Sequence, residues 1–317
     1  MALPIILDVD TGTDDALALL FAALHPDLDL IGVSCVGGNT SLPNVVENTL
    51  RVLALAGAHD VPVAAGATRP LIEPARDASY VHGSNGLADI VLPEAGRTAE
   101  KEGAIEFLRR TILGHPEKVT LVALAPQTNL ALLLRAYPEV AHNIERIVFM
   151  GGSASVGNAT AVAEFNVWHD PEAAAIVLDS GVPLYMYGLD VFNHVAVPEA
   201  VAEALVASEN PVARLVAGLL LHPIVGPNGP EPYLGWIGDA GAVCSLVIPD
   251  ALGVERLPVK VELSGYGRGA TLVDRRAIPG EDMIHGLADV WTPVDVALTV
   301  DEDRMVELFL DTVAPGR

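Results

Sequence analysis

The feature that most constrains this chain is a cluster of four aspartates close to its amino terminus. Residues 5–15 read IILDVDTGTDD, in which an apolar run ends in two alternating aspartates and a glycine follows. An apolar stretch with helical character continues from about Ala16. An apolar run, a glycine turn and a helix start in this order predict a strand, a turn and a helix. In an open α/β sheet that turn lies at the carboxyl end of a strand, where ligands bind.

The spacing of the aspartates also restricts the chemistry of the turn. Carboxylates that converge at one strand end repel one another unless a cation or a proton lies between them. A purely structural interpretation accounts for Asp14 and Asp15, because a first helical turn favours acidic residues, with Thr13 as the helix cap. That interpretation leaves Asp8 and Asp10 unexplained. We therefore expect a site for a divalent metal ion.

The first two thirds of the chain predict repeated βα units. The expected strands are 4–8, 29–36, 61–64, 118–123, 145–150 and 183–188. The helices between several of them are expected at 14–25, 43–57, 101–113, 127–136 and 171–180. This alternation predicts an α/β fold with an open, mainly parallel, Rossmann-like sheet flanked by helices.

The last third predicts further helices and a carboxyl-terminal β-hairpin. Helices are expected at 198–207, 211–222, 239–247 and 302–313, and the hairpin strands at 259–264 and 270–275. A loop rich in glycine and proline, 223–238, carries Tyr233 and Trp236. We find no internal repeat or clean linker in the sequence, so we expect residues 1–317 to form one catalytic domain.

Charge and hydropathy argue against several classes of partner. The formal net charge of −23 disfavours binding to nucleic acid or to anionic membranes. No uncharged apolar stretch reaches the ~18 residues typical of a membrane span, and the first residues lack the basic segment of a signal peptide. Cys35 and Cys244 are far apart and suggest neither a disulfide framework nor a zinc site. We expect a cytoplasmic protein.

Other polar or flexible residues follow the predicted strands. Asn39 comes after the second strand and a pair of glycines, Leu124 follows the fourth, and Met150 ends the fifth just before two more glycines. Glycine at such positions lets the backbone approach a ligand, although a simple turn explains each pair equally well. Asp239 opens a helix of small residues after the aromatic loop.

A second polar group precedes the helix expected at 171–180. Asn158, Glu164 and Asn166 gather in what reads as a loop. Asp170 is expected to be the N-cap of the following helix, which begins with a proline.

The ordered set of motifs resembles the inosine-uridine-preferring nucleoside hydrolases. The pattern D-x-D-x-G-x-D-D at residues 8–15 is similar to the amino-terminal signature of that family. The other motifs follow in family order across nearly the whole chain: Gly38-Asn39, Thr128-Asn129-Leu130, Met150-Gly151-Gly152, Glu164-Phe165-Asn166, Asp170-Pro171 and the 267–274 hairpin. The resemblance implies an open α/β fold, a tightly bound Ca²⁺, and hydrolysis of the N-glycosidic bond of ribonucleosides to base and ribose.

The resemblance also implies roles for individual residues. The calcium ligands would be Asp10, Asp15, Asp239 and the backbone carbonyl of Leu124, a set of oxygens that suits a hard cation. Asp10 would in addition accept the proton of the attacking water. The residues that would bind the sugar are Asp14, Asn39, Asn158, Glu164 and Asn166, with Met150 packing near it and Asp8 supporting the site from behind. The expected partner is a small ribonucleoside in nucleoside salvage, and family members often form homodimers or homotetramers.

One position departs from the family pattern. Many members have a histidine directly before the calcium-binding aspartate, where it helps to protonate the leaving base, and here that residue is Gly238. Trp236 or Tyr233 would substitute by stacking on the base, His82 by lying on a mobile loop near it, and His222 more remotely. Trp236 is equally well explained as a loop aromatic that covers the core. The base preference is therefore open.

Three other functions are weighed against hydrolysis. The glycine before Asp239 leaves open a ribose- or nucleoside-binding member that lacks effective leaving-group activation. Asp8 and Asp10 also resemble the opening of haloacid-dehalogenase-type phosphatases, which need threonine or valine where this chain has Gly12. A nucleoside phosphorylase is disfavoured, because no basic phosphate-binding cluster accompanies these motifs. A calcium-dependent ribonucleoside hydrolase is the function that we expect.

Overall fold

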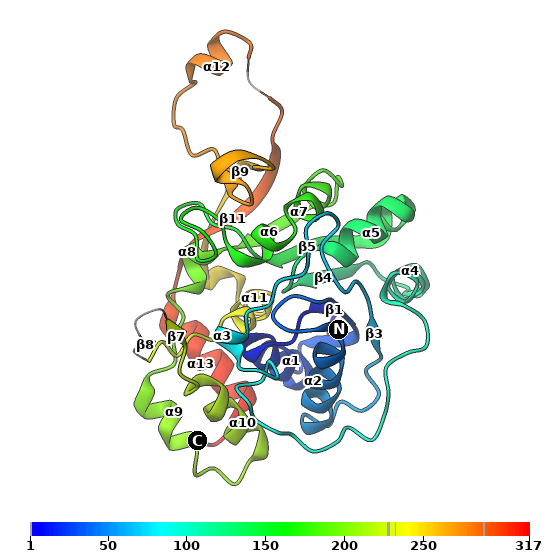
Figure 1. Ribbon diagram of the computed structural model, residues 1–317, viewed down its shortest axis with the longest axis vertical. Coiled ribbons are helices and arrows are strands. Elements are labelled where there is room, and N and C mark those ends of the chain that lie inside the picture. The colour runs from blue at the N-terminus through cyan, green and yellow to red at the C-terminus, as the bar shows by residue number, and fades with distance from the viewer. Residues whose placement is uncertain (1, 227–228, 232, 288) are drawn as a thin grey trace.

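A nine-stranded sheet forms the centre of the protein (Figure 1). The computed structural model describes residues 2–226, 229–231, 233–287 and 289–317. The strands lie in the order β10-β9-β11-β6-β5-β4-β1-β2-β3. Their bounds are β1 Leu3–Val9, β2 Leu28–Cys35, β3 Val63–Ala65, β4 Val119–Ala123, β5 Ile144–Met150, β6 Leu184–Tyr187, β9 Leu252–Val261, β10 Thr271–Val273 and β11 Thr292–Val300.

Neighbouring strands from β3 to β11 are parallel, whereas β9 pairs antiparallel with both β11 and β10. The expected open, mainly parallel sheet with a carboxyl-terminal hairpin is therefore confirmed. The hairpin is not separate, however, because β9 joins the main sheet through β11.

Helices cover both faces of the sheet and bury two apolar clusters. The longer helices are α1 Thr13–Leu24, α2 Leu42–Leu55, α4 Ala104–Gly114, α5 Thr128–Ala136, α7 Pro171–Leu178, α9 Glu199–Leu205, α10 Pro211–Leu220, α11 Asp239–Cys244 and α13 Glu302–Val313. Alternate residues of β1 point to opposite faces, since Ile5 and Leu7 join the cluster under α1, α2, α10, α11 and α13, while Ile6 joins the cluster under α4, α5 and α7. The period-2 pattern of a central strand thus builds both cores.

The sequence analysis missed β11 and the shortest elements. Residues 292–300 read TPVDVALTV, and the proline and the aspartate in this run hide a strand that is half-exposed and near the sheet edge. The other missed elements have only two to six residues, too few to show a clear periodicity. They are α3 Ser79–His82, α6 Phe165–His169, α8 Leu189–Phe192, α12 Glu281–Ile284, β7 Val225–Gly226, β8 Gly229–Pro230 and 3-10 turns at Pro138–Asn143, Pro249–Ala251 and Gly265–Gly267.

The start of α1 differs from the expected cap. Thr13 is already helical and Gly12 is the N-cap, so the assignment of Thr13 as cap was wrong. Asp15 takes over the capping, because its Oδ2 accepts the amide hydrogen of Gly12 at 2.9 Å. Asp170 is confirmed as the N-cap of α7, where its Oδ1 accepts the amide hydrogen of Ala173 at 3.1 Å.

The fold brings several strand ends to one edge of the sheet. The strands β1, β2, β4 and β5 are parallel neighbours or near neighbours. The residues that follow or end them therefore meet at the same carboxyl edge. Within the described parts of the chain, the structure contains no helix long and apolar enough to cross a membrane.

Candidate active site

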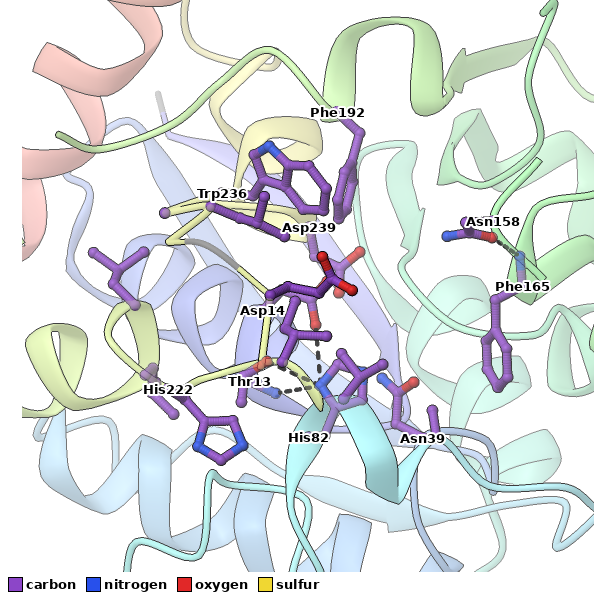
Figure 2. A pocket seen from close by; sticks show the side chains of 18 of the residues that line it. Thr13, Asp14, Asn39, His82, Asn158, Phe165, Phe192, His222, Trp236 and Asp239 are labelled. Atoms are coloured by element: carbon purple, nitrogen blue, oxygen red, sulfur yellow. Dashed lines mark hydrogen bonds and ion pairs between the residues drawn. The ribbon is translucent and has the colours of Figure 1, made fainter. Parts of the chain in front are cut away.

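Four aspartates meet where β1 ends and where α1 and α11 begin. Asp10 follows β1, Asp14 and Asp15 lie in the first turn of α1, and Asp239 opens α11, which packs against α1. One carboxylate oxygen from each of Asp14, Asp15 and Asp239 lies within 4.8 Å of the others. Figure 2 shows Asp14 and Asp239 adjacent in the centre of the site. The structure thus brings together acids from the first strand–helix turn and from the last third of the chain.

Burial makes this arrangement electrostatically costly without a cation. Burial and, after it, the charge of the neighbouring Asp14 raise the pKa of Asp15 to about 7. Burial together with the charge of Asp15 holds the pKa of Asp10 well above its ordinary value, and burial with Asp14 does the same for Asp239. Oδ1 of Asp14 and Oδ1 of Asp239 are buried and accept no hydrogen bond from any described residue. Unsatisfied carboxylate oxygens of this kind fit a hard metal cation.

Asn39 holds two of these carboxylates in place. Its backbone amide donates to Oδ2 of Asp10 at 2.6 Å, and its side-chain amide donates to Oδ1 of Asp10 at 3.2 Å and to Oδ2 of Asp15 at 3.1 Å. Gly38 makes this approach possible, because a Cβ at that position would lie 2.0 Å from Oδ2 of Asp10. The glycine after β2 is therefore required by a close approach and not only by a turn.

Asp8 lies behind the cluster and outside the cavity. Its Oδ1 accepts hydrogen bonds from the Ser34 hydroxyl at 2.6 Å and from the Asn129 side-chain amide at 2.8 Å. Burial raises its pKa to about 7, against the lowering effect of these two hydrogen bonds. The contact to Asn129 links β1 to the start of α5, so that Asp8 ties together two strand ends beneath the site.

Glu164 and Asn166 form a second polar group around α6. The Glu164 carboxylate accepts amide hydrogens from Asn166, Val167 and Gly152 at 2.8–3.1 Å, which makes it the N-cap of α6. Burial nevertheless raises its pKa to about 7. The Asn166 side-chain amide donates to the carbonyl of Leu124 at 2.9 Å. It also donates to the carbonyl of Met150 at 3.1 Å, so its position is fixed by two strand ends.

These residues border one cavity of about 490 Å³. Of the predicted site residues, those that line it are Asp14, Asn39, His82, Leu124, Met150, Asn158, Glu164, Asn166, Trp236 and Asp239. Asp10 and Asp15 are fully buried against the lining residues Asn39 and Asp14. Asn158 lies on the far side of the cavity from Trp236, where its Oδ1 accepts the amide hydrogen of Phe165 at 2.9 Å (Figure 2).

Aromatic residues surround the other end of the cavity. Trp236 and Phe192 form an edge-to-face pair with ring centroids 5.9 Å apart (Figure 2). The hydroxyl of Tyr233 donates to the carbonyl of Val197 at 2.8 Å, which anchors the aromatic loop. The sequence analysis missed Phe192 and also the lining residues Tyr80, Phe165, Leu219–Leu221, Pro223 and Ile224, although it named His222 between them. Phe192 ends a four-residue helix and has no recognisable motif around it.

His82 lies between the two ends of the cavity. Its Nδ1 accepts the amide hydrogen of Thr13 at 3.1 Å and lies 2.9 Å from the Thr13 hydroxyl oxygen. The same atom is 3.9 Å from Oδ1 of Asp14 (Figure 2). Burial lowers the pKa of His82 despite the opposing charge of Asp14. The histidine therefore helps to cap α1 in addition to lining the cavity.

Gly238 adopts a backbone conformation that suits only glycine. Its φ of +54° and ψ of −123° lie outside the regions that L-residues occupy. A Cβ at this position would lie 2.5 Å from Cβ of Asp14 and 2.7 Å from its Oδ2. In this structure, therefore, no side chain at position 238 fits without moving Asp14.

Comparisons with known proteins agree with the geometry of the site. The model of the family described as "Inosine-uridine preferring nucleoside hydrolase" matches residues 5–307. The pyrimidine-specific ribonucleoside hydrolases RihA of Salmonella arizonae and Citrobacter koseri are 45% and 39% identical to this chain. Each alignment covers 99% of this chain, and 98% and 99% of the relative.

Solved structures agree as well. A plant nucleoside hydrolase superposes with a TM-score of 0.87 at 28% identity, covering 99% of this chain and all of that one. A purine-preferring ribonucleoside hydrolase from Gardnerella vaginalis superposes with a TM-score of 0.86 at 28% identity, covering 98% of both chains. The chain belongs to the inosine-uridine preferring nucleoside hydrolase family.

Proposed function

We propose that this protein hydrolyses the N-glycosidic bond of ribonucleosides to free base and ribose, with calcium as its metal ion. The observation that carries the proposal is the buried cluster of Asp10, Asp14, Asp15 and Asp239 at the floor of the cavity. Oδ1 of Asp14 and Oδ1 of Asp239 lack protein partners, and both residues line a cavity large enough for a nucleoside. Family membership supports the same reaction.

Asp10, Asp15 and Asp239 would hold the calcium ion together with the carbonyl oxygen of Leu124. Carboxylate and carbonyl oxygens are the ligands that calcium prefers, and the unpartnered Oδ1 of Asp239 is available for this role. The Leu124 carbonyl accepts one hydrogen bond from Asn166 and retains a second lone pair. When bound, calcium would polarise the attacking water and orient the ribose hydroxyls.

Asp10 would accept the proton of the attacking water. Its carboxylate receives two hydrogen bonds from Asn39, which leaves it fixed in orientation and surrounded by other acids. A metal cation makes its bound water more acidic, so a carboxylate fixed beside that water can take its proton. Asn39 therefore serves as a positioning residue for this group and as a sugar contact at the cavity wall.

Asp14, Asn158, Glu164 and Asn166 would bind the ribose, with Met150 packing beside it. All five line the cavity, and backbone groups at the ends of β4 and β5 and in α6 hold Glu164 and Asn166. Glycosidic cleavage passes through a transition state in which positive charge develops on the sugar. Carboxylate and amide oxygens fixed in advance stabilise that charge without reorganising.

The base would lie between Trp236, Phe192 and His82. Curated relatives are named pyrimidine-specific and one structural neighbour is named purine-preferring, so both classes of base belong in the first assay. Gly238 in place of histidine is the observation that favours a second candidate, a nucleoside-binding member without effective turnover.

One experiment distinguishes these two functions. Initial rates are measured on uridine, cytidine, inosine, adenosine, guanosine and a nitrophenyl riboside, each with calcium and after chelation. The nitrophenyl group needs little or no protonation to leave, so it reports on the ribosyl chemistry alone. Calcium-dependent cleavage of any of these substrates supports the hydrolase. Binding of calcium and ribose without cleavage of any substrate contradicts it.

We further propose that residues 1–317 act as one catalytic unit in a cytoplasmic homo-oligomer, either a dimer or a tetramer. The sheet contains strands from both ends of the chain, which supports a single unit. The segment around α12 projects from the rest of the protein (Figure 1). It exposes apolar side chains at Ile278, Ile284 and Val290, which would pack between subunits. Light scattering on the purified protein measures the oligomeric state.

A further inference from the structure

Three groups near the base end of the cavity are not available to give a proton to a departing base: Gly238 has no side chain, the Tyr233 hydroxyl donates to Val197, and Nδ1 of His82 is an acceptor. A Cβ at Gly238 would collide with Asp14, so no side chain fits there without moving that residue. Nδ1 of His82 accepts the amide hydrogen of Thr13, so the ring carries its hydrogen on Nε2 and is neutral. A neutral imidazole is a poor acid. Figure 2 shows His222 well away from Trp236 and Phe192.

The same end of the cavity offers several aromatic faces. Trp236 and Phe192 meet edge to face, and Tyr233 lines the cavity from the same loop as Trp236. The hydrogen bond from Tyr233 to Val197 and the isolated β-bridge between Trp236 and Ala196 hold this wall against the segment between α8 and α9. Aromatic faces attract flat cations through the negative charge above the ring.

The charged residues at this end are acidic. Glu199 and Glu231 line the cavity, and no lysine or arginine does so among the residues that the structure describes. Glu199 begins α9 directly after the segment that anchors Tyr233, and burial followed by the charge of Glu199 raises the pKa of that phenol. Neither glutamate forms an ion pair with another described residue. The formal net charge of −23 adds a long-range field that attracts cations.

From the aromatic wall, the two free glutamates and the missing proton donor, we infer that the preferred substrates are ribosides whose base carries a fixed positive charge. This inference rests on the proposed function, because it assumes the ribosyl chemistry at the carboxylate cluster. Bases of this class include N-alkylated purines and pyridinium rings. Their shared chemistry is a flat aromatic ring with a delocalised charge.

The reaction of such a substrate balances without a proton donor. The oxygen of water forms a bond to C1′ of the ribose while the bond from C1′ to the base nitrogen breaks. The electron pair of the broken bond returns to the base and cancels its positive charge, so the base leaves neutral. The proton lost by the water goes to Asp10. A neutral base, in contrast, would leave as an anion unless it is protonated.

Two matched pairs of substrates test the inference. 7-Methylguanosine is compared with guanosine, since they differ by one methyl group and one charge. A ribosyl pyridinium is compared with the nitrophenyl riboside, since both have a six-membered aromatic leaving group that needs no protonation. With calcium present, we expect kcat/KM for 7-methylguanosine to exceed that for guanosine by at least about a hundredfold, the usual value of one acid catalyst.

Variants then assign the recognition to the two glutamates. The double variant Glu199→Gln with Glu231→Gln should lower kcat/KM for the two cationic substrates about tenfold relative to the nitrophenyl riboside. The control is Glu203→Gln with Glu209→Gln, which removes the same charge from exposed positions outside the described lining. The control should leave this ratio unchanged. Added salt should reduce the cation preference of the unmodified protein.

Each outcome separates this inference from the function on which it rests. Cleavage of the nitrophenyl riboside with no advantage for 7-methylguanosine overturns the inference and leaves the hydrolase intact. An equal fall, in both double variants, of kcat/KM for the cationic substrates relative to the nitrophenyl riboside overturns the role of Glu199 and Glu231. Failure to cleave any riboside, with calcium bound, overturns the proposed function itself.

Discussion

The two ends of the cavity are built on different principles. At the ribose end, acids and amides follow the strands of the central sheet, and buried hydrogen bonds fix them, as with Asn39 and Asp10. At the base end, the lining comes from a loop and short helices, and the aromatic contact between Trp236 and Phe192 and the hydrogen bond from Tyr233 to Val197 hold the wall together. The rigid end serves the bond that breaks, and the loop end serves the group that varies between substrates.

This difference predicts that changes at the ribose end reduce the chemical step and changes at the base end alter affinity. The largest effect is expected for Asp10→Asn. The amide cannot accept the proton of the attacking water, so kcat should fall about 10³-fold. Steady-state kinetics on the nitrophenyl riboside measures this loss.

The control for this variant is Asp29→Asn, which changes an exposed aspartate at the opposite end of the sheet. It should retain the unmodified rate. Calcium titration of the Asp10 variant should also show weaker binding, because one ligand charge is lost. A variant at Asp10 that keeps full activity would contradict the division between the two ends.

The second prediction concerns pH and the helix that carries Asn166. His169 lies in α6, and burial followed by the charge of Arg76 lowers its pKa from 6.5 to about 4. The unfolded state therefore binds more protons between these values, and stability is lost as the pH falls through this window. The loss should reach the order of 3 kcal/mol below pH ~4.

Urea unfolding of the unmodified protein and of His169→Phe measures this effect. The variant removes the titrating ring but keeps an aromatic group beside Phe165, whose ring centroid lies 5.3 Å away. Its stability should depend less on pH between about 6.5 and 4. Parallel curves for the two proteins would exclude His169 as the cause.

The third prediction removes one hydroxyl from the substrate at the ribose end. A 2′-deoxyriboside leaves polar groups of the site without a partner, so kcat/KM should fall at least about a hundredfold relative to the riboside. The pair 2′-deoxyuridine and uridine measures the effect. Comparable turnover of both would show that this end of the cavity does not read the ribose hydroxyls.

The fourth prediction tests the point where the two ends touch. Gly238→Ala places a Cβ 2.5 Å from Cβ of Asp14 in a conformation unsuited to L-residues, and should cost about 2 kcal/mol of stability. The matched control is Gly57→Ala, where φ is also positive but no atom lies within 4 Å. Only the first variant should also lower kcat/KM, because it displaces Asp14.

The amino-acid sequence predicts the two ends with unequal success, for a physical reason. Strand ends, glycine turns and acids are local features, so the sequence alone predicts Asp10 and Asn39 at one edge of a parallel sheet. Asp239 joins them only through the resemblance to the family. It does not place Phe192, because a four-residue helix has no periodicity and the contact with Trp236 joins two distant segments. The strand at 292–300 was missed because its proline and aspartate disguise a sheet partner of β6.

The smallest effect is expected at the base end itself. Trp236→Ala removes one aromatic face and should raise KM for uridine about tenfold, the usual value of one base stacked on an aromatic ring. Inhibition by free ribose should not change, because ribose occupies the other end of the cavity. The control is Trp291→Ala, because Trp291 lines a different cavity.

If Trp236→Ala weakens inhibition by ribose as strongly as it weakens the binding of uridine, the two ends are coupled. The loop would then position the carboxylates and not only the base.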